Sequence, residues 1–185
     1  MKIQFFACLC LTAILLFSCG NSDEKEEEYS AYLFAYFVGN SPAEEAIHYA
    51  LSPDVYNYYA LNNNEPIVST DEISTTGGVR DPHILRTEDG ENFYMVVTDL
   101  LSSKGWTNTA MILMKSNDLV NWESTVIEIP ETFPGEFSDI TRVWAPQTIY
   151  DEKEGKYMVY FSMLQPGSYD KIYYTYANED FTGLE

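Results

Sequence analysis

Tyr157-Met158-Val159-Tyr160-Phe161-Ser162 is the stretch that decides the fold, because the chain contains it three times in related form. Runs of the same β-branched and aromatic character lie at 32–37 and 93–98. Each run has about six residues and is bounded by turn formers, which is typical of β-strands. No segment from residue 30 onward sustains a long helical period. The sequence therefore predicts an all-β fold.

Each of the three runs belongs to a longer repeat. A second run and then a turn follow it, and Ser52, Ser116 and Ala177 hold equivalent places, 64 and then 61 residues apart. A four-stranded unit that recurs at this interval indicates a blade of a β-propeller. The alternative is a β-sandwich with accidental similarity. The second runs occupy 47–52, 111–116 and 172–177.

The three units, at about 31–70, 79–130 and 142–185, are unequal. Units two and three open with an expected innermost strand that unit one lacks, and unit three ends before its fourth strand. We therefore expect about two and a half blades. The expected inner strands are 82–85 and 146–150, the expected fourth strands are 66–69 and 124–129, and the expected hairpin turns are Glu88-Asp89-Gly90 and Glu154-Gly155.

Residues 1–18 predict a secretory signal. Lys2 gives a positive start, and the apolar run from Ile3 to Phe17 is too short for a membrane span. Cys19 follows at once and resembles the lipidated cysteine of a bacterial lipoprotein, so we expect cleavage before it and acylation of its thiol. The alternative is an ordinary signal peptide with an incidental cysteine. Cleavage would leave Cys19 as the one cysteine, which excludes an internal disulfide.

Residues 19–30 form an acidic tether that resembles the surface-export signal of Bacteroidetes lipoproteins. A solvated spacer is the plainer interpretation, and the two are compatible. We expect an outer-membrane lipoprotein held by its lipid anchor, displayed on the cell surface or, alternatively, on the periplasmic leaflet.

Composition excludes two classes of partner. The formal net charge of −19 argues against nucleic acid, whose phosphates would be repelled. The chain has only two His and three Cys, which are too few to favour a metal centre built from His and Cys ligands. We therefore predict no metal and no cofactor.

Asp81 is the first candidate for chemistry. Inner strands line the channel of a propeller, so a residue at the start of one can reach a ligand, and we expect Pro82 to bias Asp81 toward an extended backbone. The alternative for Asp81 is a turn residue paired with Arg80. His83 and Trp144 have a site role or a core role as open alternatives.

Five motifs in order resemble glycoside hydrolase family 43. The resemblance covers about residues 31–185 and implies a five-bladed propeller that acts on arabinose- or xylose-containing plant polysaccharides. The motifs are Arg80-Asp81-Pro82-His83-Ile84, Phe93-Tyr94-Met95, the segment 115–122, Val143-Trp144-Ala145-Pro146 and the segment 156–162.

The resemblance also implies roles. It places Asp81 as the general base of inverting hydrolysis, in which a base activates water and a second carboxyl group protonates the leaving oxygen. Arg80, His83, Trp144 and Gln147 are then the expected substrate-binding residues. Some members hold a channel calcium, but nothing in this stretch identifies ligands for it.

The sequence departs from the family at two acids. Gln147 stands where the family often has an Asp that tunes the proton donor, so Asp99 or Asp139 would have to take that role. No position corresponds to the general acid Glu. We therefore expect the N-terminal part of an arabinofuranosidase-like enzyme, inactive by itself. The alternative is a non-catalytic surface glycan-binding lipoprotein with a propeller fold.

Overall fold

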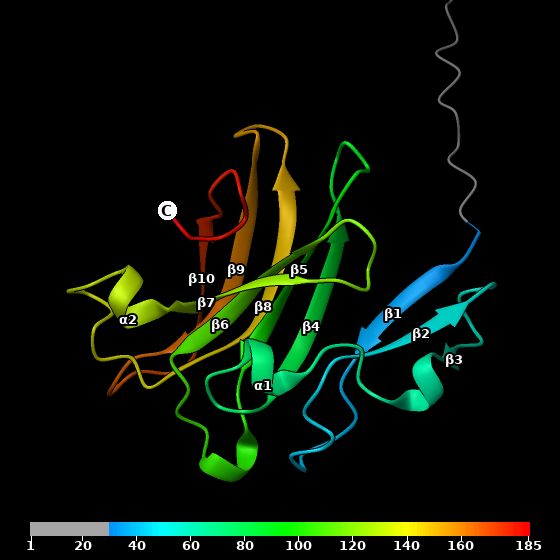
Figure 1. Ribbon diagram of the computed structural model, residues 1–185. Helices are drawn as coiled ribbons and strands as arrows, with labels where there is room; N and C mark the ends of the chain where they lie inside the picture. Colours follow the sequence, from blue (N-terminus) through cyan, green and yellow to red (C-terminus); the bar gives the residue numbers. More distant parts are fainter. Residues whose placement is uncertain (1–29) are drawn as a thin grey trace, which may run out of the picture.

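A computed structural model describes residues 30–185 as three antiparallel sheets that stand side by side (Figure 1). The predicted signal segment 1–18, the predicted lipidation site Cys19 and all but the last residue of the tether 19–30 lie outside the described residues. The expectation of an all-β propeller architecture is confirmed, with the sheets as full or partial blades.

The middle sheet has four strands in the order in which they occur in the chain, β4-β5-β6-β7. The innermost strand β4 is longer than expected, because its pairing already begins with Val79 opposite Asp99. The predicted fourth strand at 124–129 corresponds to β7. The strands are β4 (Val79–Arg86), β5 (Phe93–Asp99), β6 (Ala110–Ser116) and β7 (Glu123–Glu128).

The third sheet has three strands in the order β10-β9-β8. After β10 the chain turns, and Ala177 forms an antiparallel bridge with Leu184 while the amide of Asn178 donates to the Gly183 carbonyl. The last residues therefore fold back beside the end of β10. The strands are β8 (Arg142–Asp151), β9 (Lys156–Leu164) and β10 (Lys171–Tyr176).

The first sheet, β1-β2-β3, corrects one prediction. The strand expected at 66–69 is absent from this described segment, and a two-residue strand, β3 (Tyr59–Ala60), pairs with β2 (His48–Ser52) instead. Pro66 has no N–H to give to a ladder, so the segment loops, and the Ile67 amide donates to the carbonyl of Ile47, the residue just before β2. The strand β1 (Tyr32–Tyr36) pairs with the other side of β2.

The helical elements among residues 30–185 are single turns. They are the 3₁₀ turns η1 (Asn62–Asn64) and η2 (Ser102–Lys104) and the helices α1 (Thr70–Ile73) and α2 (Ile129–Thr132). Within 30–185, no helix has the length and hydropathy required to cross a membrane.

Two apolar cores lie on the two faces of the middle sheet. Successive strand residues point to opposite faces, so Met95 and Val97 enter one core while Tyr94 and Val96 enter the other. The first core joins β5 and β6 to the β1–β3 sheet through residues such as Ile47, and the second joins them to β8–β10. This double burial explains why β5 and β6 are continuous apolar runs.

Equivalent turns explain the 64-residue spacing. After β2 and after β6, a serine hydroxyl donates to an aspartate two residues later, Ser52 to Asp54 and Ser116 to Asp118, both at 3.0 Å. The backbone amide and side-chain amide three residues further on, at Asn57 and Asn121, then donate to that aspartate. These bonds lower the pKa of both aspartates far below the ordinary range.

Candidate functional site

Two β-bulges interrupt the inner strands at equivalent places. The pairing of β4 with β5 shifts between Arg80 and His83, and the pairing of β8 with β9 shifts between Trp144 and Gln147. Each bulge contains one non-glycine residue in the left-handed region, Asp81 with φ 52° and Ala145 with φ 49°. Bulges of this kind re-aim side chains and are frequent beside active sites.

The backbone of Asp81 corrects the expectation that Pro82 would extend it. A residue with φ 52° is not extended, because the bulge imposes a local turn on the strand that the preference of an Asp-Pro pair does not override. Such a conformation costs on the order of 1 kcal/mol or more and persists only where neighbouring contacts fix it.

Thr98 supplies those contacts. Its hydroxyl donates to Oδ2 of Asp81 at 2.8 Å and accepts from the backbone amide of Ala145, also at 2.8 Å. Thr98 is completely buried at the end of β5, next to the inner strands of two sheets. A single hydroxyl thus joins the carboxylate of one bulge to the backbone of the other.

The structure places Arg80 in an ion pair between the first and second sheets. Its Nη1 lies 2.7 Å from Oε1 of Glu45, which is fully buried, and 2.6 Å from Oδ1 of Asn40. The guanidinium lies over the rings of Phe37 and Trp106, at 4.4 and 5.2 Å from their centroids. With 13% of its side chain exposed, Arg80 is mainly a tie between β4 and the loop after β1.

Trp144 lies next to that tie, at the start of the second bulge. Its ring meets Trp106 edge to face, with centroids 6.3 Å apart, and carries the Arg142 guanidinium at 4.3 Å. Arg142 in turn pairs with Asp170 at 2.6 Å. Arg80, Trp106 and Trp144 therefore form a row from the first bulge to the second.

His83 and Gln147 are the equivalent residues that follow the two bulge prolines. Nδ1 of His83 accepts from the amide of Thr148 on β8 at 3.3 Å. Burial lowers the pKa of His83, so its ring is neutral at pH 7 and can accept this bond. Gln147 is exposed, and its Oε1 accepts from the Tyr160 hydroxyl, which orients the free amide nitrogen.

Neither candidate for the tuning acid reaches the bulges by any contact that the described residues show. Asp99 is fully buried and accepts from the backbone and hydroxyls of Thr75 and Thr76 and from the Ser74 hydroxyl. These bonds shape the loop that leads into β4. Asp139 is exposed in the segment between α2 and β8.

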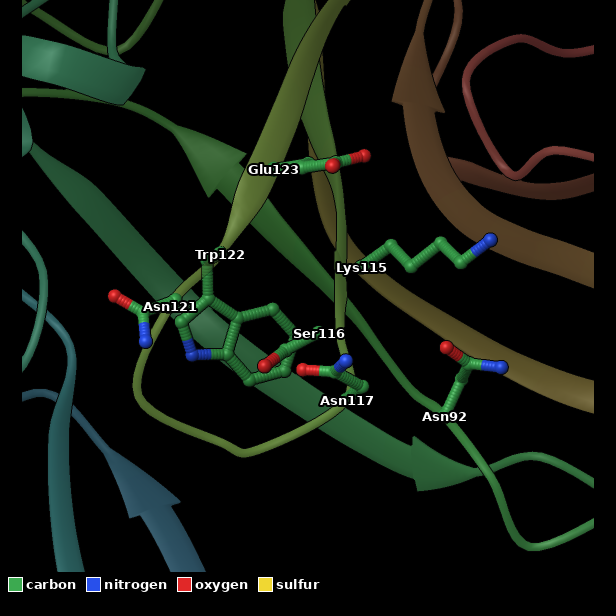
Figure 2. A pocket seen from close by; sticks show the side chains of 7 residues that line it. All are labelled: Asn92, Lys115, Ser116, Asn117, Asn121, Trp122 and Glu123. Atoms are coloured by element: carbon green, nitrogen blue, oxygen red, sulfur yellow. The ribbon is translucent and has the colours of Figure 1, made fainter.

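Two cavities lie at the other end of the blades from Asp81. One, of about 360 Å³, lies at the hairpin ends of β4–β7, and its lining residues include Trp122, Lys115 and Glu123 (Figure 2). The other, of about 370 Å³, lies between the hairpins of the second and third sheets, beside Tyr157 and Lys156. Within residues 30–185, no three His, Cys, Asp or Glu side chains group to hold a metal ion.

The sequence motifs indicate the residues at the bulges but not the residues that hold them in place. Arg80, Asp81, His83, Trp144 and Gln147 lie on neighbouring inner strands, as Figure 1 shows for β4 and β8. Thr98, Glu45, Trp106 and Tyr160 were not singled out. Thr98 is a threonine at the end of an apolar strand and belongs to no recognisable site motif. Its second hydrogen-bond partner, Ala145, is close only because β8 lies beside β5.

Comparisons with known proteins agree with this architecture. A family model described as a probable glycosyl hydrolase domain, related to glycoside hydrolase family 43, matches residues 27–185. An alpha-L-arabinofuranosidase of Bifidobacterium longum subsp. longum is 28% identical over an alignment of 116 residues, and the match covers 59% of this chain and 11% of that protein.

Solved structures show the same fold. An alpha-L-arabinofuranosidase from Clostridium thermocellum matches with a TM-score of 0.59 and 17% identity, over 84% of this chain and 46% of that one. An exo-1,5-alpha-L-arabinanase from a bovine ruminal metagenomic library matches with a TM-score of 0.58 and 17% identity, over 85% of this chain and 50% of that one. The chain spans about half the length of these structures or less. Because the family model covers most of its length, the chain belongs to the glycosyl hydrolase domains related to glycoside hydrolase family 43.

Proposed function

We propose that this protein hydrolyses glycosidic bonds in arabinose-containing plant polysaccharides by the inverting mechanism, with Asp81 as general base. One observation carries the proposal: a carboxylate stands at a bulge of an inner strand, in a strained backbone conformation, with one of its oxygens fixed by a buried hydroxyl. Strain of this kind clusters at functional sites.

The proposed reaction needs a second carboxyl group. In inverting glycosidases the base removes a proton from water, while an acid about 6.5–9.5 Å away protonates the leaving oxygen. Both carboxylate oxygens of Asp99 accept hydrogen bonds from the loop before β4, so Asp99 is not the acid. Gln147 has an amide in place of a carboxyl group and cannot donate a proton as an acid does. The proposal assigns the base to Asp81 and assigns neither Asp99 nor Gln147 as the acid.

The sugar-contacting surface is proposed to include Trp144 and Gln147. An aromatic ring packs against the apolar face of a sugar, and an amide can donate to and accept from its hydroxyls. Arg80 and His83 are proposed to support this surface. The relatives named as acting on arabinose-containing substrates make this the first substrate class to test.

The cellular setting is a proposal of its own. The apolar run before Cys19 and the acidic residues after it support secretion and lipid anchoring in an outer membrane, with cell-surface display. Metabolic labelling with an alkyne fatty acid, comparing the wild type with Cys19→Ala, tests the anchor. Equal labelling of both proteins would contradict it.

The experiment for hydrolysis uses the protein expressed from its full gene. It is incubated with arabinan, arabinoxylan, xylan and galactan, and the anomer first released is followed by proton NMR. We expect release of sugar from the arabinose-containing polymers, with inversion of the anomeric configuration. Release with retention of configuration would contradict the role of Asp81 as base. Release of sugar from xylan or galactan alone would show that the substrate class is a different one.

Glycan binding without hydrolysis is the second candidate, and the cavity in Figure 2 favours it. Trp122 lies in this cavity between polar side chains, and Asn92, Asn117 and Glu123 make no side-chain hydrogen bond to the described residues. Affinity electrophoresis in arabinan, with wild type and Trp122→Ala, tests it. Retardation that Trp122→Ala abolishes, without any hydrolysis, would favour binding as the function.

A further inference from the structure

We propose that Thr98 is a positioning residue that gives the two oxygens of Asp81 different roles. Oδ2 is held by Thr98, and Oδ1 is the atom that takes the proton from water. The role of Asp81 as a base rests on the proposed function. The coupling of Asp81 to Ala145 through Thr98 rests on the hydrogen bonds alone and does not depend on that function.

The first step is the direction of the two hydrogen bonds. A backbone amide can only donate, so the Ala145 N–H at 2.8 Å makes the Thr98 oxygen its acceptor. The hydroxyl has one hydrogen, and the other atom within reach is Oδ2 of Asp81 at 2.8 Å. Thr98 must therefore donate to Asp81, and Oδ2 must accept.

Second, the Thr98 hydroxyl makes these two hydrogen bonds in a buried place. Thr98 is completely buried, and among residues 30–185 its hydroxyl has no further hydrogen bond. A buried hydroxyl that lost Asp81 would be left with an unsatisfied hydrogen, which costs about 1–3 kcal/mol. The Thr98 hydroxyl is thus held by Ala145 on one side and by Asp81 on the other. The Asp81 carboxylate cannot rotate without breaking its hydrogen bond to Thr98.

The third step concerns the free oxygen. Oδ1 of Asp81 accepts no hydrogen bond from any residue that the structure describes. An oxygen that already accepts a strong bond is a poorer proton acceptor than one that does not, because protonation there would oppose the donor hydrogen. In the proposed step the O–H bond of the attacking water breaks, its proton passes to Oδ1, and its oxygen forms the bond to the anomeric carbon. The glycosidic bond from that carbon to the leaving oxygen breaks at the same time, and the leaving oxygen takes its proton from the general acid.

The bond to Ala145 adds a geometric role. Thr98 lies on β5, Asp81 on β4 and Ala145 on β8, so the hydroxyl fixes the base relative to the neighbouring sheet that carries Trp144 and Gln147. Since a misplacement of about 1 Å can cost on the order of 10²-fold in rate, a hydroxyl that spans both sheets would control catalysis without touching the sugar.

The test compares Thr98→Val, which keeps the shape and removes the hydroxyl, with Thr98→Ser, which keeps the hydroxyl. In the protein expressed from its full gene, Thr98→Val should lower kcat at least about 10-fold with KM within about twofold, while Thr98→Ser should retain most of kcat. Rates are expressed per folded protein, from the unfolding curve of each variant. Equal kcat in wild type and Thr98→Val would overturn the positioning role.

A second measurement does not need activity. In ¹H–¹⁵N spectra, the Ala145 amide should shift when Asp81 is replaced by asparagine, and this response to Asp81→Asn should vanish in the Thr98→Val background but persist in the Thr98→Ser background. An Ala145 amide that responds equally in Thr98→Val would overturn the coupling. If the coupling is found but the wild type hydrolyses no glycan, the proposed function fails and the coupling stands.

Discussion

Replacing Arg80 by alanine should loosen the first sheet from the second. Arg80 lies on β4, and Glu45 lies in the segment before β2, so their 2.7 Å ion pair crosses between the two sheets. Glu45 is fully buried, and Arg80 is 13% exposed. Removing the guanidinium leaves a buried carboxylate without its countercharge.

The magnitude follows from what remains around Glu45. Breaking a buried ion pair by deleting one partner costs about 3–5 kcal/mol. The Ser102 amide lies 3.0 Å from both carboxylate oxygens and donates its one hydrogen between them, so it still holds the carboxylate and the lower end of that range applies. With a urea slope of about 2 kcal/mol per molar, the midpoint of unfolding should fall by about 1.5 M.

The assay is urea unfolding followed by tryptophan fluorescence, with Lys153→Ala as matched control. Lys153 also pairs with a glutamate, but across 3.9 Å and with 89% of its side chain exposed, so its loss should cost at most about 0.5 kcal/mol. A double-mutant cycle with Glu45→Gln should give a coupling of about 1–3 kcal/mol. A cost below about 1 kcal/mol for Arg80→Ala would refute the structural assignment of this pair.

Three further perturbations test the fold and the bulges. Gly78→Ala should cost about 1–3 kcal/mol in thermal unfolding, because its Cβ would meet the Leu100 carbonyl oxygen at 2.6 Å; an unchanged Tm would contradict the packing. Amide donors lower the pKa of Asp118, so stability present above about pH 4 should fall on acidification, and Asp118→Asn should lack that part of the fall. Burial lowers the pKa of His83, so folding should lose stability as the pH falls below about 6.5; a ring that titrates at or above its ordinary value in ¹⁵N NMR would contradict this.

The strand pattern was predictable because both faces of the middle sheet are buried. That burial makes β5 and β6 unbroken apolar runs, which a sequence displays directly. The turn at Asp118 was equally visible, since its hydrogen bonds are all made within a few residues. Local interactions of this kind repeat whenever the sequence repeats.

What could not be predicted depends on contacts between sheets. The strand expected at 66–69 does not form, because Pro66 lacks a backbone N–H to donate and β2 pairs with Tyr59–Ala60 instead. The left-handed backbone of Asp81 depends on a bulge and on Thr98, which is 17 residues away in the chain. Glu45 is likewise defined by Arg80, 35 residues later. Sequence patterns that extend over a few residues do not encode such pairs.

The most direct test of the account is the rate at which the Asp81→Asn variant cleaves an aryl α-L-arabinofuranoside, measured beside the wild type in the protein expressed from its full gene. Asparagine keeps the size of the side chain and can still accept from Thr98, so the unfolding midpoint should change little. If Asp81 is the general base, kcat should fall by about 10²–10⁴-fold. A wild-type rate in a folded Asp81→Asn variant would contradict it.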